Sequence, residues 1–305
     1  MTVPRSYFRM LALSMRAGLE CVSQAFRSRH AGSVMSFLAP DGGFSGRRGG
    51  ADLYYTGFAT RALFALDRLD PPTAATVASY LNCQVPTNII DAASLVAARI
   101  HCGNEPANAE KILSVVERFR TADGGYGKTP DAGSGSTYHS LLALLCYDAF
   151  GRQTAAPDRL IRFVESRRRT DGGFCEVASS EHSGTNATAA GLCVMVLLHA
   201  ADPSLVEPAA DHLCGLQHYS GGWPAARNVL LPDLLSTYTA LATLELVGRL
   251  NRDVLDKALA FALTCEREGG GFGAGPWDRG VDAEYTCYGL GIVALARLNG
   301  LAIES

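Results

Sequence analysis

Residues 270–298 read GGFGAGPWDRGVDAEYTCYGLGIVALARL and combine a double glycine, an aromatic residue, a polar loop and a long apolar run. A fixed period of several tens of residues is typical of repeat architectures, and this arrangement returns along the chain. The last four double glycines are separated by 48, 49 and 49 residues. The five copies are Gly42-Gly43-Phe44, Gly124-Gly125-Tyr126, Gly172-Gly173-Phe174, Gly221-Gly222-Trp223 and Gly270-Gly271-Phe272.

Each repeat predicts a pair of helices. The segment before the double glycine is amphipathic and ends in charged residues, as in ILSVVERFRTADGG, whereas the segment after the loop is apolar on nearly all sides, as in EYTCYGLGIVALARL. A helix that is apolar all round must be buried all round, so it lies inside and its amphipathic partner outside. Glycine suits the turn between them because it adopts positive φ without a Cβ clash.

Six such outer–inner pairs predict an all-α protein with concentric helices, in which the circle either closes or stays open as a solenoid. The gap of 82 residues between the first two double glycines leaves room for one further unit without the glycine signal, and its helix is expected from Asn88. No long segment alternates between polar and apolar residues, so no substantial sheet is expected.

Composition excludes several classes of function. The chain has 305 residues and a formal net charge of −3, which gives no electrostatic footprint for nucleic acid. Nine cysteines without a CxxC pair fit a reducing compartment. Arginines interrupt the apolar residues of the N-terminus, so no signal peptide is expected, and no run approaches the ~20 apolar residues of a membrane span. We expect a cytoplasmic protein.

The helical repeat with GGF or GGW at its turn resembles the prenyltransferase/squalene-cyclase repeat, which includes the β subunits of protein prenyltransferases and class II terpene cyclases. The resemblance covers about residues 35–300. It implies an (α/α)6 toroid with a central cavity. We therefore expect an N-terminal helical segment, residues 1–34, followed by one toroid domain of about six helix pairs, residues 35–305.

In such a toroid, the loops after the glycine turns and the N-termini of the inner helices meet at one mouth of the cavity. Helix N-termini favour anions, because their free N–H groups and dipoles both attract negative charge. An aromatic cavity under a cationic rim would suit a lipid tail with a diphosphate head. The expected rim cations are Arg47, Arg48, Lys128, Arg227 and Arg279, and the expected cavity aromatics are Tyr54, Tyr55, Tyr138, Tyr238, Tyr288 and Trp277.

Three positions match the protein prenyltransferase pattern. His182 follows the glycine turn of the fourth repeat, Gly172-Gly173, at nearly the spacing of the family's diphosphate-binding histidine. Arg227 precedes Asp233 by six residues, as the diphosphate-binding arginine precedes the zinc-binding aspartate. The segment DAEYTCY resembles D-x-Y-H-T-C-Y. The resemblance implies that His182 and Arg227 bind diphosphate with Lys128 or Arg279. Asp233, Asp282 and Tyr285 would then face the acceptor or act as base.

Two departures from the pattern bear on the chemistry. Leu235 and Tyr285 stand where the family has its zinc-binding cysteine and histidine, and one carboxylate cannot hold a catalytic zinc that needs about three protein ligands. We therefore expect no metal site, no zinc, and Mg²⁺ only as a companion of a bound diphosphate. The DxDD motif of class II cyclases is also absent, which leaves Asp52 as the best lone acid.

Structural roles compete with these assignments. Asp233 and Asp282 each precede an apolar run, where aspartate commonly caps a helix. Cys287 lies one helical turn from Asp282 and is either a buried packing residue or part of a rebuilt site.

The leading hypothesis is a zinc-independent enzyme that acts on an isoprenoid diphosphate in the central cavity, by prenyl transfer to a small acceptor or by terpene cyclisation. The alternative is a toroid without catalysis that binds a lipid or a protein as a scaffold. Glycan or thioester chemistry has little support, since neither paired carboxylates at catalytic spacing nor a CGEQ segment occurs. The expected partner is an isoprenoid diphosphate or a similar lipid-like molecule, and the sequence identifies no protein partner.

Overall fold

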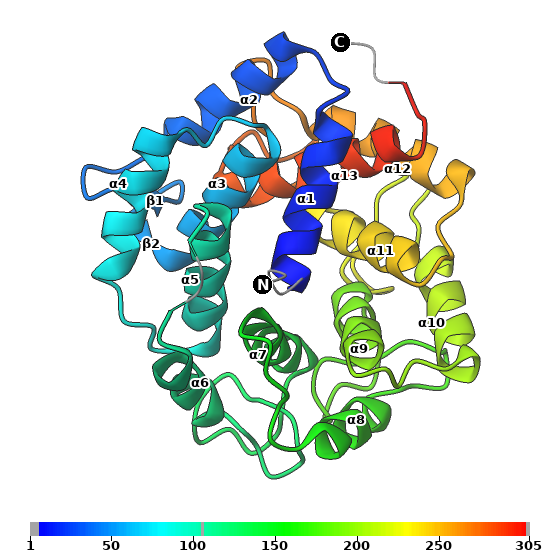
Figure 1. Ribbon diagram of the computed structural model, residues 1–305. Coiled ribbons are helices and arrows are strands. Elements are labelled where there is room, and N and C mark those ends of the chain that lie inside the picture. The colour runs from blue at the N-terminus through cyan, green and yellow to red at the C-terminus, as the bar shows by residue number, and fades with distance from the viewer. Residues whose placement is uncertain (1–5, 105–106, 303–305) are drawn as a thin grey trace.

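The computed structural model describes residues 6–104 and 107–302. Its helices form two concentric rings, as Figure 1 shows in projection. The described residues contain two short strands, β1 (Phe44–Ser45) and β2 (Ala51–Asp52), which have two residues each and pair antiparallel. The predicted all-α toroid is therefore confirmed.

Six apolar helices form the inner ring. Each packs against the next along the chain, and the last packs against the first, so the ring is closed. The helix expected from Asn88 is present, with the Asn88 side chain accepting a hydrogen bond from the Asp91 amide at the helix start. The inner helices are α3 (Leu53–Ala65), α5 (Ile89–His101), α7 (Thr137–Ala149), α9 (Thr185–Leu197), α11 (Leu234–Leu246) and α13 (Ala283–Leu298).

The outer ring also contains six helices. One of them, α2, packs against α3 and α13. All but its last residue lies in residues 1–34, the segment expected to precede the toroid. The outer helices are α2 (Gln24–Met35), α4 (Pro71–Asn82), α6 (Ala109–Glu117), α8 (Pro157–Ser166), α10 (Pro203–Gly215) and α12 (Arg252–Cys265).

The glycine turns fasten the two rings together. The first glycine of every turn has a positive φ, between 87° and 97°, which explains the choice of glycine. The aromatic residue is completely buried, and its backbone N–H donates to a hydroxyl of the following inner helix. At Trp223 the acceptor is Thr237 Oγ1, at 2.9 Å. The equivalent pairs are Phe44–Thr56, Tyr126–Ser140, Phe174–Thr188 and Phe272–Thr286.

The last glycine turn closes the ring onto α2. Gly221 lies against the carbonyl of Lys257 in α12, and Gly270 lies against the carbonyl of Arg29 in α2 in the same way. The amide of Gly271 also donates to His30 Nδ1 at 2.9 Å. Because α2 receives the last turn as α12 receives the one before it, α2 is the outer helix that completes the circle.

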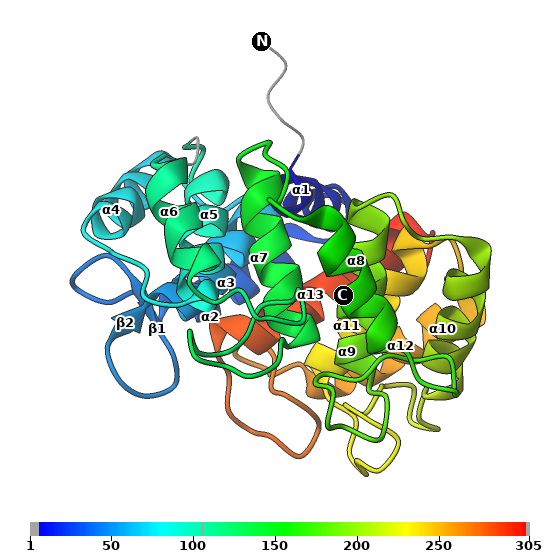
Figure 2. The ribbon, with the colours of Figure 1, turned by 90° about the horizontal axis from the view of Figure 1, so that it is seen from below.

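The first helix, α1 (Tyr7–Leu19), belongs to neither ring. It lies across one end of the toroid and packs against α13, α3, α5 and α7 (Figure 1). Its first amide, that of Tyr7, donates to Asp148 Oδ2 near the end of α7 at 2.6 Å. Figure 2 shows α1 at one end of the ring and the long loops after the glycine turns at the other. The helix therefore covers the end at which the inner helices terminate.

Two general features of the fold bear on function. All nine cysteines are unpaired. Among the described residues, no helix combines the length and the apolar character that crossing a membrane requires.

Candidate functional site

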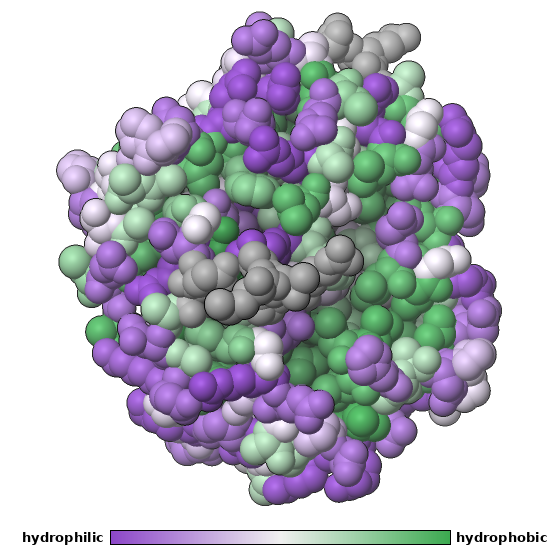
Figure 3. Space-filling view, in the orientation of Figure 1, coloured by the Kyte–Doolittle hydropathy of each residue, from purple (hydrophilic) through white to green (hydrophobic). Residues whose placement is uncertain are grey.

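A cavity of about 820 Å³ lies inside the inner ring, between α1 and the helices α3, α7, α9, α11 and α13. Most of its wall is apolar, with Phe58, Leu142, Ala190 and Ala242 among the lining residues. Figure 3 shows hydrophobic residues gathered in a hollow beside the centre of the face that carries α1. The predicted central cavity therefore exists, and its volume lies in the upper part of the usual range for small-molecule sites.

Tyrosines give the cavity its polar character. Of the six aromatics expected there, Tyr54, Tyr138, Tyr238 and Tyr288 line it, and Tyr7 of α1 joins them. Tyr55 and Trp277 do not line the cavity. Tyr55 packs over Gly46 in the loop before α3, and Trp277 packs over Gly275 with 55% of its surface exposed.

The three predicted catalytic aspartates are helix caps. Asp52, Asp233 and Asp282 precede α3, α11 and α13, and each accepts a hydrogen bond from the backbone amide three residues ahead, at 2.7–2.8 Å. The capping alternative for Asp233 and Asp282 is thus confirmed, and Asp52 caps as well. None of the three lines the central cavity.

Asp282 has a second partner that joins the first and last repeats. Arg47, in the loop between β1 and β2, donates from Nε to Asp282 at 2.8 Å. Its two terminal nitrogens donate to the two oxygens of Asp278, at 2.9 and 2.7 Å. These bonds lower the pKa of Asp278 to about 2. The cation expected at the rim is therefore a link across the ring closure.

Arg47→Gln should lower the free energy of unfolding at pH 7 by about 1 kcal/mol, since the pair is only partly shielded from water. A depressed carboxyl pKa stabilises the fold above the unfolded value of about 3.9. The difference from the parent protein should therefore shrink as the pH falls from about 4 towards 2. Urea unfolding at several pH values measures it, with exposed Arg48→Gln as the control. An equal loss at all pH values would contradict the ion-pair assignment.

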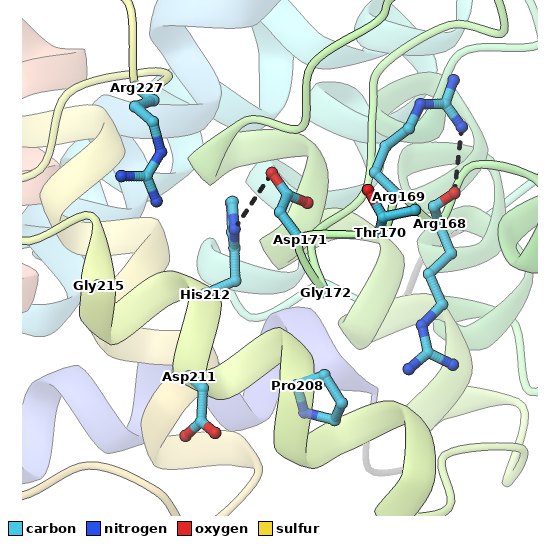
Figure 4. A pocket seen from close by; sticks show the side chains of 10 residues that line it. All are labelled: Arg168, Arg169, Thr170, Asp171, Gly172, Pro208, Asp211, His212, Gly215 and Arg227. Carbon is cyan, nitrogen blue, oxygen red and sulfur yellow. Dashed lines mark hydrogen bonds and ion pairs between the residues drawn. The ribbon is translucent and has the colours of Figure 1, made fainter.

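The four residues expected to bind diphosphate do not gather at one place. Lys128, His182, Arg227 and Arg279 are all exposed, and of these only His182 is among the residues that line the central cavity. Arg227 lies instead over a separate outer groove beside α10, together with His212 and Asp171, which pair at 3.6 Å (Figure 4). The expected joint site of His182 and Arg227 is therefore absent from the cavity wall.

Four charged residues outside the predicted set lie at the cavity: Arg61, Glu176 and Glu181 line it, and Glu284 is hydrogen-bonded to one of its tyrosines. Of these, Arg61 and Glu284 lie on inner helices. Arg61 of α3 is part of the cavity wall. Glu284, in the first turn of α13, accepts a hydrogen bond from the cavity residue Tyr54 at 2.7 Å. Burial raises the pKa of Glu284 to about 7, and the charges of Asp282 and Asp233 add to this shift. Glu284 therefore exchanges a proton near neutral pH.

Sequence signals for both residues were present. Arg61 interrupts the apolar segment LYYTGFATRALFA, and Glu284 stands where the related pattern D-x-Y-H-T-C-Y has tyrosine. A charge inside a helix that must be buried is a sign of function, because burying it without a partner is costly.

The zinc positions of the related prenyltransferases do not fit a metal here. Both oxygens of Asp233 bind Ser236, Leu235 has no lone pair, and burial raises the pKa of Tyr285 to about 12, which keeps it a neutral phenol. Cys287 is completely buried, and burial raises the pKa of its thiol to about 11. Within residues 6–104 and 107–302, no cluster of three or more His, Cys, Asp or Glu could hold a metal ion.

Comparison with solved structures shows the same fold at low sequence identity. A type II terpene cyclase from Scytonema, MstE_D109N in complex with geranylgeranyl dihydroxybenzoate (substrate), has a TM-score of 0.62 at 12% identity, covering 93% of this chain and 97% of that one. The α-1,6-mannanase GH76A of Salegentibacter has a TM-score of 0.63 at 13% identity, with 90% and 98% covered. Protein geranylgeranyltransferase-I of Candida albicans with GGPP has a TM-score of 0.50 at 16% identity, with 96% and 82% covered.

Sequence comparison identifies the family. No match was found among curated protein sequences. A family model described as the prenyltransferase alpha-alpha toroid domain matches residues 3–92 and 88–298, which is nearly the whole chain. The chain belongs to the prenyltransferase alpha-alpha toroid domain family.

Proposed function

We propose that the protein is an enzyme of isoprenoid chemistry that holds the prenyl chain of its substrate in the central cavity and works without zinc. The observation that carries this proposal is the cavity of about 820 Å³ with an apolar wall and tyrosine faces. Aromatic faces suit the carbocations of prenyl chemistry, because their π electrons attract positive charge. Two solved structures of the same fold contain a geranylgeranyl compound, which is consistent with a chain of this kind.

Glu284 is the proposed proton acceptor. In a prenyl diphosphate the cation forms when the carbon–oxygen bond breaks and diphosphate leaves with the electron pair. Prenyl transfer and ring closure then both end when a proton leaves, either from the acceptor that has captured the prenyl cation or from a carbon beside that cation. A carboxylate with a pKa of about 7 can take this proton at neutral pH, and Tyr54 holds it at the cavity edge. Asp233 and Asp282, which the sequence suggested for this role, are occupied as caps.

The apolar wall supports a prenyl substrate over a glycan, although a mannanase shares the fold. A sugar needs many hydrogen-bonding partners, whereas this wall is formed mainly by aliphatic and aromatic side chains. The unpaired cysteines support the cytoplasm as the proposed place of action.

Ala190→Trp should abolish binding of a prenyl chain, because Ala190 is buried in the cavity wall and an indole there would occupy the space of the ligand. The measurement is calorimetric titration with geranylgeraniol and with geranylgeranyl diphosphate, with and without Mg²⁺ and Zn²⁺. We expect micromolar binding that Zn²⁺ does not change and that falls at least tenfold in the variant.

The matched control is Ala75→Trp, an exposed position on the outer helix α4 that should leave binding unchanged. Binding of neither compound by the parent protein would overturn the proposed function. Binding without any product by mass spectrometry, when acceptors are also supplied, would instead favour the scaffold alternative.

A further inference from the structure

Arg61 is a partly buried cation that faces the cavity. It lies in the third turn of α3 and lines both the central cavity and a smaller cavity of about 60 Å³ between α3, α5 and α7. Its Nε is buried and has no hydrogen-bond partner, while the side chain as a whole is partly open to the cavity. The ring of Phe58 lies 5.4 Å from the guanidinium carbon. The charge is thus held between an aromatic face and open space.

No carboxylate among the described residues pairs with Arg61. Its nearest ionisable neighbours are Tyr7, Tyr238, Tyr288 and Cys287, and it also donates a hydrogen bond to the Cys287 thiol. Burial raises the pKa of all four groups, that of Cys287 to about 11, so they are neutral at pH 7. His101 does not help, because burial and the arginine both lower its pKa. The positive charge of Arg61 therefore has no counter-ion in this part of the chain.

An arginine in this situation needs an anion from outside. Guanidinium does not lose its proton in proteins, so the charge cannot be removed by a pKa shift. A buried charge without a partner destabilises the fold, whereas one that meets an oxyanion gains charge-assisted hydrogen bonds. The hydroxyls of Tyr138, Tyr238 and Tyr288 also line this cavity and form no hydrogen bond with another described residue, so they add donors beside the guanidinium.

We propose that Arg61 anchors an oxyanion carried by the substrate, a carboxylate or a diphosphate, inside the central cavity. This inference rests on the proposed function, because it places the head of the same prenyl compound. It assigns recognition of the head to Arg61 and the cavity tyrosines, and not to Arg227, which lies over the outer groove. The apolar wall formed by α7, α9 and α11 is left for the chain.

The test compares three probes with the same prenyl chain: geranylgeraniol, geranylgeranoic acid and geranylgeranyl diphosphate. The parent protein should bind at least one anionic probe about 10- to 100-fold more tightly than the alcohol. The anionic probe with the larger gain in affinity over the alcohol identifies the head group as carboxylate or diphosphate. Arg61→Met should remove the preference and leave binding of the alcohol unchanged, while Arg227→Ala should keep the preference.

Stability without ligand gives an independent readout. If the charge of Arg61 has no partner in the protein, Arg61→Met should raise the midpoint of urea unfolding. If the arginine instead stabilises the fold, the same substitution should lower the midpoint. Arg61→Lys should retain part of the preference because it keeps the charge.

A preference for the anions that persists in Arg61→Met, or no preference in the parent protein, would overturn this inference while the prenyl cavity still stood. If no probe bound at all, the inference and the proposed function would both fail.

Discussion

Trp223→Ala is expected to lower the free energy of unfolding by about 3–5 kcal/mol. Trp223 is the largest completely buried side chain among the described residues and is hydrogen-bonded to both α10 and α11 behind its glycine turn. Its indole Nε1–H donates to the Leu213 carbonyl at 2.7 Å. The substitution leaves a cavity that the two rings cannot close and a buried carbonyl without that donor.

The chain offers a matched control, since its other tryptophan, Trp277, has 55% of its surface exposed. Trp277→Ala should change the free energy of unfolding by no more than about 0.5 kcal/mol. Urea unfolding followed by far-ultraviolet circular dichroism measures both variants without relying on tryptophan fluorescence. If Trp223→Ala lowered the free energy of unfolding as little as Trp277→Ala, the aromatic residue of the glycine turn would not be what holds the two rings together.

The recurrence of this fastening explains why the fold could be predicted from the sequence. A glycine pair whose first member has a positive φ, followed by a buried aromatic, leaves a local signal, and five copies fix the order of the helices. The apolar character of α5 sufficed to place the sixth inner helix, from Asn88, without the glycines. The role of α2 was missed because its contact with the last turn joins residues 241 positions apart, Gly271 and His30.

The site was less predictable because a spacing along the chain does not say where a side chain points. Arg227 follows the glycine turn Gly221-Gly222 as expected, yet it lies over an outer groove (Figure 4). Asp233 and Asp282 match the related pattern, yet a residue directly before a helix is also where a carboxylate binds the free amides. The prediction of the cavity tyrosines was more accurate, because four of them lie on inner helices and the closed ring determines which face of each helix points inward.

Glu284→Gln is expected to raise the free energy of unfolding by about 2–3 kcal/mol at pH values above 7 and to leave it unchanged at low pH. The pKa of Glu284 is raised from about 4.5 to about 7 in the folded protein, mainly by burial. In a carboxyl with a raised pKa, ionisation costs more in the folded state, so the parent protein loses stability as the pH rises from about 4.5 through 7. Glutamine never ionises and still accepts the Tyr54 hydrogen bond.

Glu117 is the control with the opposite sign. Burial opposes its ionisation, but hydrogen bonds from Arg120, Tyr147 and Tyr126 hold the pKa of Glu117 below its usual value. Glu117→Gln should therefore destabilise the protein at neutral pH, and the loss should fade as the pH falls below about 4. Urea unfolding between pH 2 and 9 separates the two profiles.

The same Glu284 variant tests the proposed chemistry. Once a substrate is in hand, kcat of the parent protein should rise with pH through about 7, and Glu284→Gln should lower kcat by about 100-fold or more and remove this dependence. A variant that gained stability above pH 7 but kept its kcat would show that the carboxyl titrates as the structure indicates and that another group accepts the proton. The variant could instead gain no stability above pH 7 while kcat of the parent protein did not change with pH. The pKa of Glu284 would then lie in its ordinary range, because an ordinary carboxylate is already ionised at every pH above 6.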